Sequence, residues 1–362
     1  MRTSGWIIAH LPGDGARSLS PEPLPERLAQ GSLMLEFTLM RGERGPLPLM
    51  HLARKGGFFS LALGADGRLT LLQRQGAAVH ALSLDLGAEC ETGGTMRLSW
   101  SWNLARSESL LTLEQPRAGT LRQRAGRAPL PLSRSDIAAL ASGAEPARIG
   151  PRTDWFAFGT HRHPVGPGAC FAPATPIATP NGPRPAGSLR AGDLVETVDA
   201  GPQPLLWSGR VALPALGALR PVRLCAPAFG ATRDLWLMPQ HRIALEGPVV
   251  DDLFGEDEVL VAAQHLVDGC TALQPDRPCV LNWQGLLLAD HHLLIADDCR
   301  IESLSAGRLA CQPALARTTA LAALVAEETL PLHRSPARRA LEPFEAQALA
   351  ASRARGRGPL AA

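Results

Sequence analysis

The sequence has no long hydrophobic run. Among its 362 residues no stretch approaches the roughly 20 apolar residues that a membrane-spanning helix requires, so we expect no membrane span. The N-terminus carries a short apolar island, Trp6-Ile7-Ile8, ahead of His10 and Pro12, which is too short for the apolar core of a secretory signal. We therefore expect no Sec leader, and the compartment stays open between the cytoplasm and a leaderless export route.

The chain also has little net charge. Lys and Arg number 36 against 34 Asp and Glu, a formal balance of +2. This balance provides no overall field that would attract nucleic acid or an acidic membrane. The one basic concentration, Arg353, Arg355 and Arg357, is typical of a solvated tail. We predict no nucleic-acid partner.

The seven cysteines are loosely spaced, and no C-x-x-C pair occurs. This spacing indicates neither a disulfide framework nor a structural zinc site. His161, His163, His291 and His292 could in principle bind a metal, but paired histidines rarely suffice without a third ligand. We predict neither a metal nor a cofactor. A G-x-S-x-G elbow is missing as well, so no motif supports a Ser/His/Asp hydrolase.

Apolar residues are plentiful, at 45% of the chain against 19% charged, which is enough for two domains with sizeable cores. In the first half, "GSLMLEFTLM" alternates at period two, and "FFSLALGADGRLTLLQRQ" predicts a hairpin around Asp66-Gly67. Ser135 or Asp136 is expected to cap a short helix. Short strands with polar turns predict an antiparallel sandwich. With its "SWSWN" strand, this half resembles the concanavalin A-like and laminin-G-like jelly rolls.

The second half is also predicted to consist mainly of short strands. Residues 146–168 are rich in Pro and Gly and indicate a linker, strands return over 169–305, and Ala-rich helical segments and a basic tail occupy 306–362. The expected fold class is all-β: an N-terminal antiparallel jelly-roll-like sandwich over 1–145, the linker, a second β-domain and a helical C-terminal extension.

Four sequence blocks follow one another in the second β-domain. They are "CFAPATPIATPNGPRPAGSLRAGDLVETVDAGPQPLLWSGR", "DLWLMPQHRIAL", "GEDEVLVAAQHLVDG" and "LLLADHHLLIADDCRIES". In this order they resemble the hedgehog-type and intein-type Hint modules, particularly the bacterial stand-alone Hint proteins, whose domain begins at the cysteine itself. The resemblance implies a Hint β-fold over residues 169–305.

The resemblance further implies self-cleavage with a cysteine nucleophile. The thiol of Cys170 would attack the carbonyl carbon of Ala169 and convert the amide to a thioester, an N-to-S acyl shift. His241, in the place of the second-block histidine, would protonate the departing nitrogen. His292 matches the closing-block histidine and is expected to assist the second step or to hold the site. The acyl acceptor is unknown and would be water or an amine.

Four other residues are expected to lie outside the cleavage chemistry. His291 is predicted to face outward, because neighbours in a strand point to opposite faces, and His265 to support the fold. Cys225 and Cys299 are expected to fill strand interiors and to be less accessible than Cys170.

Two positions depart from the family pattern. Met238 stands three residues before His241, where the family has Thr or Ser, so a hydroxyl that helps to polarise the scissile amide is replaced by a thioether. At the exit, "CRIESLSAG" contains Glu302 and Ser303 but no asparagine that could cyclise. The chemistry therefore predicts opening of the upstream bond without splicing.

An alternative function remains open. The Hint module could be inactive, with Cys170 a buried core cysteine in a binding or surface protein whose sandwich recognises a glycan or a protein partner. The Met238 substitution is the feature that favours this alternative.

Overall fold

The computed structural model describes residues 5–116, 119–166, 171–276 and 279–356. The chain divides into two compact units, each with its own hydrophobic core. Unit 1 comprises Met1–Val165, Leu216–Ala218 and Pro278–Val280. Unit 2 comprises Gly166–Ala215, Leu219–Arg277 and Leu281–Ala362.

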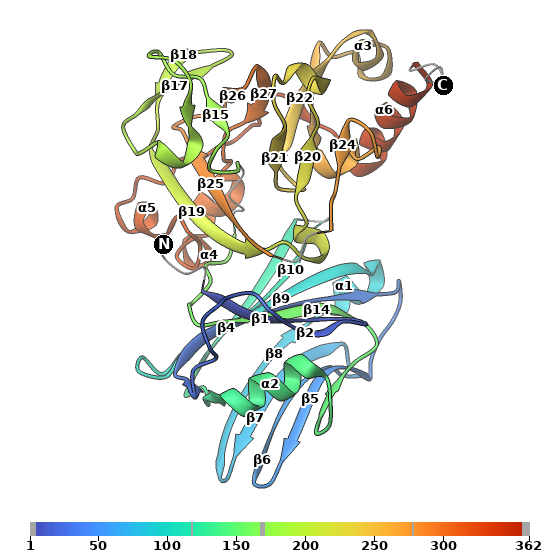
Figure 1. The fold of residues 1–362 in the computed structure, drawn as a ribbon, viewed down its shortest axis with the longest axis vertical. Helices are drawn as coiled ribbons and strands as arrows, with labels where there is room; N and C mark the ends of the chain where they lie inside the picture. The colour runs from blue at the N-terminus through green and yellow to red at the C-terminus, as the bar shows by residue number, and fades with distance from the viewer. Residues whose placement is uncertain (1–4, 117–118, 167–170, 277–278, 357–362) are drawn as a thin grey trace. The chain divides into compact units, whose positions relative to one another are not determined.

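Unit 1 contains two antiparallel sheets and a short ribbon among its described residues (Figure 1). The larger sheet runs in the order β11 (Thr120–Arg127), β10 (Glu108–Gln115), β9 (Gly94–Asn103), β4 (Gln30–Leu39), β14 (Thr153–Gly159), β1 (Trp6–Leu11) and β2 (Gly15–Ser18). The smaller sheet runs in the order β13 (Ala147–Ile149), β5 (Leu47–Arg54), β6 (Gly57–Leu63), β7 (Arg68–Gln75) and β8 (Ala78–Asp85). The ribbon pairs β12 (Leu132–Ser133) with β3 (Arg27–Leu28).

The alternating sequence pattern produces the core of unit 1. Leu98, Trp100 and Trp102 of β9 lie fully buried on one face, as the period-two spacing predicts. They belong to the same hydrophobic cluster as Leu61 of β6 and Leu71 of β7, which come from the smaller sheet. Because residues of both sheets share one core, the two sheets form a sandwich.

The predicted hairpin and helix of unit 1 are present. Gly67 has a φ of 74° in the turn between β6 and β7, a conformation that favours glycine. The helix α2 spans Arg134–Ser142, and its N-cap is Ser133, not Ser135 or Asp136 as expected. Ser133 Oγ accepts the Asp136 N–H at 3.1 Å, while the Asp136 carboxylate accepts the Ser133 N–H at 2.7 Å. The cap lies earlier because this reciprocal pair needs a three-residue spacing.

The stretch expected to be a linker contains two strands. β13 pairs with β5, and β14 lies between β4 and β1 in the larger sheet. Three aromatic side chains of this stretch, Trp155, Phe156 and Phe158, are buried in β14. The Pro and Gly residues that suggested a linker flank these strands, so local composition concealed the pairing.

Unit 2 contains a large mixed sheet and two smaller sheets within the described ranges. The large sheet follows the order β16 (Arg184–Pro185), β15 (Pro176–Ile177), β26 (Leu293–Ala296), β27 (Cys299–Glu302), β22 (Arg242–Glu246), β23 (Glu258–Ala262) and β28 (Arg339–Ala340). Strand β26 also pairs with β17 (Leu194–Thr197), which pairs in turn with β18 (Gly201–Pro204). The smaller sheets are β19 (Trp207–Pro214) with β25 (Val280–Leu287), and β21 (Leu235–Leu237) with β20 (Val222–Leu224) and β24 (Ala272–Leu273).

Helical segments complete both units. The α-helices besides α2 are α1 (Gly87–Thr92), α3 (Pro248–Phe254), α4 (Pro313–Ala316), α5 (Ala322–Ala326) and α6 (Pro343–Gly356). The 3₁₀ turns are η1 (Ala186–Ser188), η2 (Gly217–Leu219), η3 (Ala228–Gly230), η4 (Ala263–Leu266) and η5 (Gly307–Cys311). The prediction of an all-β chain with a helical C-terminal extension is confirmed. None of the helices in the described residues is long and apolar enough to cross a membrane.

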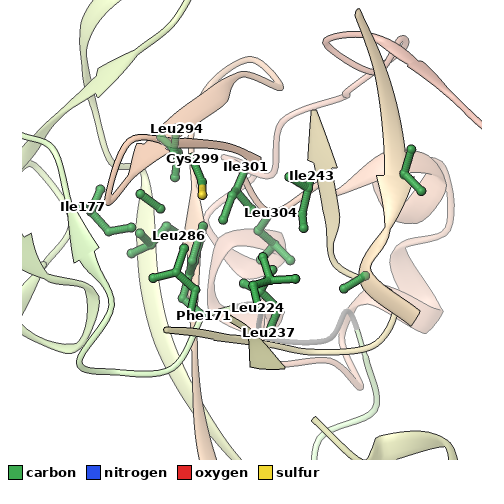
Figure 2. Packing of buried hydrophobic residues seen from close by; sticks show 14 of the residues in the cluster. Phe171, Ile177, Leu224, Leu237, Ile243, Leu286, Leu294, Cys299, Ile301 and Leu304 are labelled. Atoms are coloured by element: carbon green, nitrogen blue, oxygen red, sulfur yellow. The ribbon is translucent and has the colours of Figure 1, made fainter. Parts of the chain in front are cut away.

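The core of unit 2 joins residues from all of its sheets. Phe171, Leu237 and Leu286 lie in this cluster together with Ile301 and Leu304, and Figure 2 shows them converging on one another. Phe171 forms isolated bridges with Leu237 and Gln284, so the chain just after Cys170 is anchored between β21 and β25. The core therefore positions the start of the second domain.

We predict that this core carries much of the stability of unit 2. Replacing Leu286, which is fully buried, with alanine is expected to lower the free energy of unfolding by about 2–5 kcal/mol, because it leaves a cavity. The control Leu194→Ala, at a side chain that is 46% exposed, is expected to change it by about 0.5 kcal/mol or less. Denaturant unfolding of the two variants measures the difference, and equal losses would contradict the core assignment.

Candidate functional site

His241 lies in a tight turn between β21 and β22. Its backbone N–H donates to the carbonyl of Met238 at 3.0 Å, and its own carbonyl accepts the Ala263 N–H at 2.9 Å. The residue is buried, at 3% exposure. Its ring Nε2 lies 2.9 Å from the backbone oxygen of Glu302. A carbonyl only accepts, so Nε2 carries the hydrogen, and Nδ1 is the ring atom that can accept or donate a proton in chemistry.

Phe171 packs against the His241 ring. The two ring centroids are 4.6 Å apart with planes at 85°, an edge-to-face contact. The Phe171 backbone exchanges two hydrogen bonds with Gln284, at 3.0 and 2.7 Å, and the next N–H, that of Ala172, donates to Trp236 at 3.2 Å. The strand-like segment that follows Cys170 is thereby held beside His241.

Ala169 and Cys170, the scissile carbonyl and the nucleophile of the sequence prediction, lie outside the described residues. Their distance from His241 and the relative exposure of Cys170 therefore remain predictions. Of the cysteines expected to fill strand interiors, Cys299 is buried in β27 and Cys225 is half-buried just after β20.

Met238 follows β21 and is buried, at 6% exposure. Its carbonyl closes the turn that carries His241. The position therefore lies in the same turn as His241, where the family pattern has a hydroxyl, and here the side chain brings a thioether.

Glu302, the last residue of β27, is the polar centre of this region. Its Oε1 accepts the backbone N–H of Arg242 at 3.0 Å, and its Oε2 accepts from Arg242 Nη1 at 3.2 Å. Burial alone would raise the pKa of Glu302, but the His291 ring and the Arg242 charge together hold that pKa below its usual value. Glu302 is therefore a carboxylate at neutral pH. Sequence reasoning noted it only as a residue that cannot cyclise.

The prediction that His291 faces outward is wrong. His291, expected to face outward, is buried, and its Nε2 lies 3.3 Å from Glu302 Oε2. His292 is half-buried, and its backbone pairs with Ser303 through the N–H to Ser303 Oγ at 3.1 Å and the carbonyl to the Ser303 N–H at 2.8 Å. The prediction failed because both histidines precede β26, which begins at Leu293, so strand alternation does not apply to them.

The histidine pair near the end of unit 1 lies apart from this site in the sequence and packs against Trp6. The ring centroids of His161 and His163 are 5.8 Å apart, and burial lowers the pKa of His163 to about 3. Within the described ranges, no group of three or more His, Cys, Asp or Glu side chains is arranged to hold a metal ion. His265 lies half-buried in η4.

The order of the blocks and the fold around them agree with one domain family. Residues 169–308 match the family model described as the Hint domain. This part of the chain is a Hint domain. No curated protein sequence matches the chain.

Several solved structures are similar to parts of the chain. The MchDnaB-1 intein is 14% identical, with 37% of this chain and 99% of that one covered and a TM-score of 0.27. A bacterial intein-like domain from Clostridium thermocellum is 10% identical, with 38% and 100% covered and a TM-score of 0.25. The CBM40 module of the Ruminococcus gnavus IT-sialidase is 12% identical, with 37% and 77% covered and a TM-score of 0.26. These likenesses are distant and carry no statement about binding or activity.

We predict that the cysteines differ sharply in reactivity. Burial, aided by Asp297 and Asp298, raises the pKa of Cys299 to about 12, and burial also raises the pKa of Cys90, so both stay protonated thiols at pH 8. Alkylation of the native protein, mapped by peptide mass spectrometry, is expected to label the exposed Cys270 and Cys311 first.

Cys90 and Cys299 are expected to react only when guanidinium is added, which serves as the control for complete labelling. Labelling of Cys299 in the native protein at the rate of Cys270 would show that the Hint core is open around β27.

Proposed function

We propose that the protein cleaves its own chain at the Ala169–Cys170 bond. In the first step a bond forms between Cys170 Sγ and the carbonyl carbon of Ala169, the C–N bond breaks, and the thiol proton passes to the nitrogen, which becomes the amine of Cys170. In the second step the thioester is opened by water or an amine, which takes the acyl group and returns a proton to Sγ.

The observation that carries this proposal is the contact between Phe171 and His241. Backbone hydrogen bonds and ring packing hold Phe171, the residue directly after Cys170 in the sequence, beside the His241 ring. Intramolecular attack in good orientation can supply about 7–11 kcal/mol over a bimolecular reaction. This advantage requires that the residue next to the nucleophile is held in place, as Phe171 is.

His241 is assigned the proton transfer. An amide nitrogen leaves poorly unless it is protonated, and imidazole is suited to this near neutral pH. Because Nε2–H is held by the Glu302 carbonyl, Nδ1 would accept the thiol proton of Cys170 and deliver it to the departing nitrogen. His292, at the closing strand pair, is retained as the residue proposed to assist the second step.

The proposed reaction stops after the upstream bond is opened. Splicing by the intein route needs an asparagine that cyclises at the exit, and the sequence here is Glu302-Ser303. Ser303 is fully buried, and its hydroxyl accepts the His292 N–H. The downstream segment would therefore stay attached to the Hint domain.

We predict that the purified chain yields fragments ending at Ala169 and beginning at Cys170 when it is incubated with dithiothreitol or hydroxylamine, because both attack thioesters. Cys170→Ala is expected to abolish the fragments, and His241→Ala to slow them by about a hundredfold or more. Cys270→Ala, at an exposed cysteine, is the matched control and is expected to cleave at the wild-type rate. Intact mass and denaturing gels measure the products, and fragments that persist in Cys170→Ala would disprove the mechanism.

A second function, an inactive Hint scaffold in a protein whose sandwich binds a glycan or a protein, is favoured by Met238. This buried thioether brings no hydroxyl to the turn of His241. Loss of one hydrogen bond to the reacting amide corresponds to about 1–3 kcal/mol, or roughly ten- to a hundredfold in rate.

Met238→Thr separates the two functions. If the site is intact but slowed, Met238→Thr is expected to cleave at least about tenfold faster than wild type under dithiothreitol, whereas the matched control Met238→Leu, which adds no hydroxyl, leaves the rate near the wild-type value. Gel densitometry over time measures all three rates. Absence of product from both wild type and Met238→Thr would favour the inactive scaffold.

A further inference from the structure

The C-terminal extension reaches the buried histidine of the Hint domain. The backbone N–H of Ala337 donates to His291 Nδ1 at 2.9 Å. A backbone N–H can only donate, so Nδ1 must accept and the neutral ring carries its hydrogen on Nε2. This Nε2 is the atom that lies 3.3 Å from Glu302 Oε2, a contact that is looser than a well-aligned hydrogen bond.

Glu302 connects His291 to the residues at and next to His241. Its carboxylate is held by the backbone N–H and the guanidinium of Arg242, the residue directly after His241. Its backbone carbonyl accepts the His241 Nε2–H at 2.9 Å. The Glu302 side chain therefore holds the peptide that follows His241, and the Glu302 carbonyl holds the ring hydrogen of His241.

The extension is fixed where it donates to His291. Arg338 Nε donates to Glu258 Oε2 at 2.8 Å, and its two terminal nitrogens donate to Asp199 at 3.1 and 2.6 Å. The next residues form β28, which pairs in parallel with β23. Ala337 thus lies directly before a clamped side chain and a paired strand, and its N–H has little freedom to turn away.

We propose that His291 is a positioning residue for the cleavage site, and that the C-terminal extension sets its orientation through the Ala337 N–H. In this arrangement the extension orients His291, and His291 orients the carboxylate of Glu302. Glu302 in turn keeps the hydrogen of His241 on Nε2, so that Nδ1 is the ring nitrogen available for the proposed proton transfer. The inference rests on the proposed self-cleavage for its consequence. Its structural content, the tautomer of His241, is measurable without any cleavage.

The first experiment measures that tautomer in the full chain carrying Cys170→Ala, which cannot form a thioester. Histidine labelled with ¹⁵N distinguishes protonated from unprotonated ring nitrogens, and loss of a signal in His241→Gln assigns it. The parent protein is expected to show His241 protonated at Nε2. His291→Leu, which removes both ring contacts, and Ala337→Pro, which removes the N–H, are each expected to give a mixture of Nε2–H and Nδ1–H forms.

Each disruptive variant has a matched control. His291→Gln keeps an acceptor for the Ala337 N–H and a donor for Glu302, and Ala337→Gly keeps the N–H, so both are expected to retain the parent tautomer. In the chain with Cys170 present, His291→Leu and Ala337→Pro are expected to slow thiol-induced cleavage at least about tenfold, and the two controls to restore it to within about threefold of wild type. Circular dichroism checks that each variant is folded, and if one of the two is not, the other decides.

The outcomes separate the two proposals. An unchanged His241 tautomer in folded His291→Leu or Ala337→Pro overturns the positioning role, whether or not the wild type cleaves. If His291→Leu or Ala337→Pro shifts the His241 tautomer but the wild-type chain gives no fragments, the positioning role is supported and the proposed function is overturned.

Discussion

The carboxylate of Glu302 is the constraint around which the site of unit 2 is arranged. An ionised group at 7% exposure would be penalised by several kcal/mol unless its charge were compensated. The compensation comes from Arg242 at the start of β22 and from the His291 ring before β26, while the Glu302 backbone carbonyl accepts the Nε2–H of His241. Satisfying one buried charge therefore draws together the turn, the strand pair and, through His291, the C-terminal extension.

In unit 1, buried charges are likewise compensated by neighbours on adjacent strands. Trp155, Glu36, Arg97 and Glu114 lie opposite one another on β14, β4, β9 and β10. Arg97 Nε donates to Glu36 at 2.9 Å, and the Trp155 indole donates to its other oxygen at 2.8 Å. Burial raises the pKa of Glu114 despite the nearby Arg97 charge. One arginine shared by two carboxylates favours the strand register in which all three meet, because a one-residue slip would reverse their faces.

The candidate site is held both by contacts close to its residues in the sequence and by contacts with distant segments. Phe171 is placed by the core cluster and by backbone pairing, so packing and site geometry depend on the same residue. His241 is placed by a turn of four residues that Met238 closes. Beyond these, the orientation of the ring depends on Glu302, some sixty residues further along the chain. The chemistry proposed at this position would therefore depend on parts of the protein that carry no reactive group.

Local sequence patterns predict the β-rich class, the hairpin at Asp66-Gly67, the helical extension and the order of the Hint blocks, because each depends on residues that are neighbours in the chain. Three features appear only in the folded chain: β14 is an inner strand, His291 is buried, and Glu302 joins His241 to the extension. These features depend on pairing and charge compensation between distant segments. Local patterns of polarity cannot report such contacts, since a buried Glu or His has the same identity in the sequence as an exposed one.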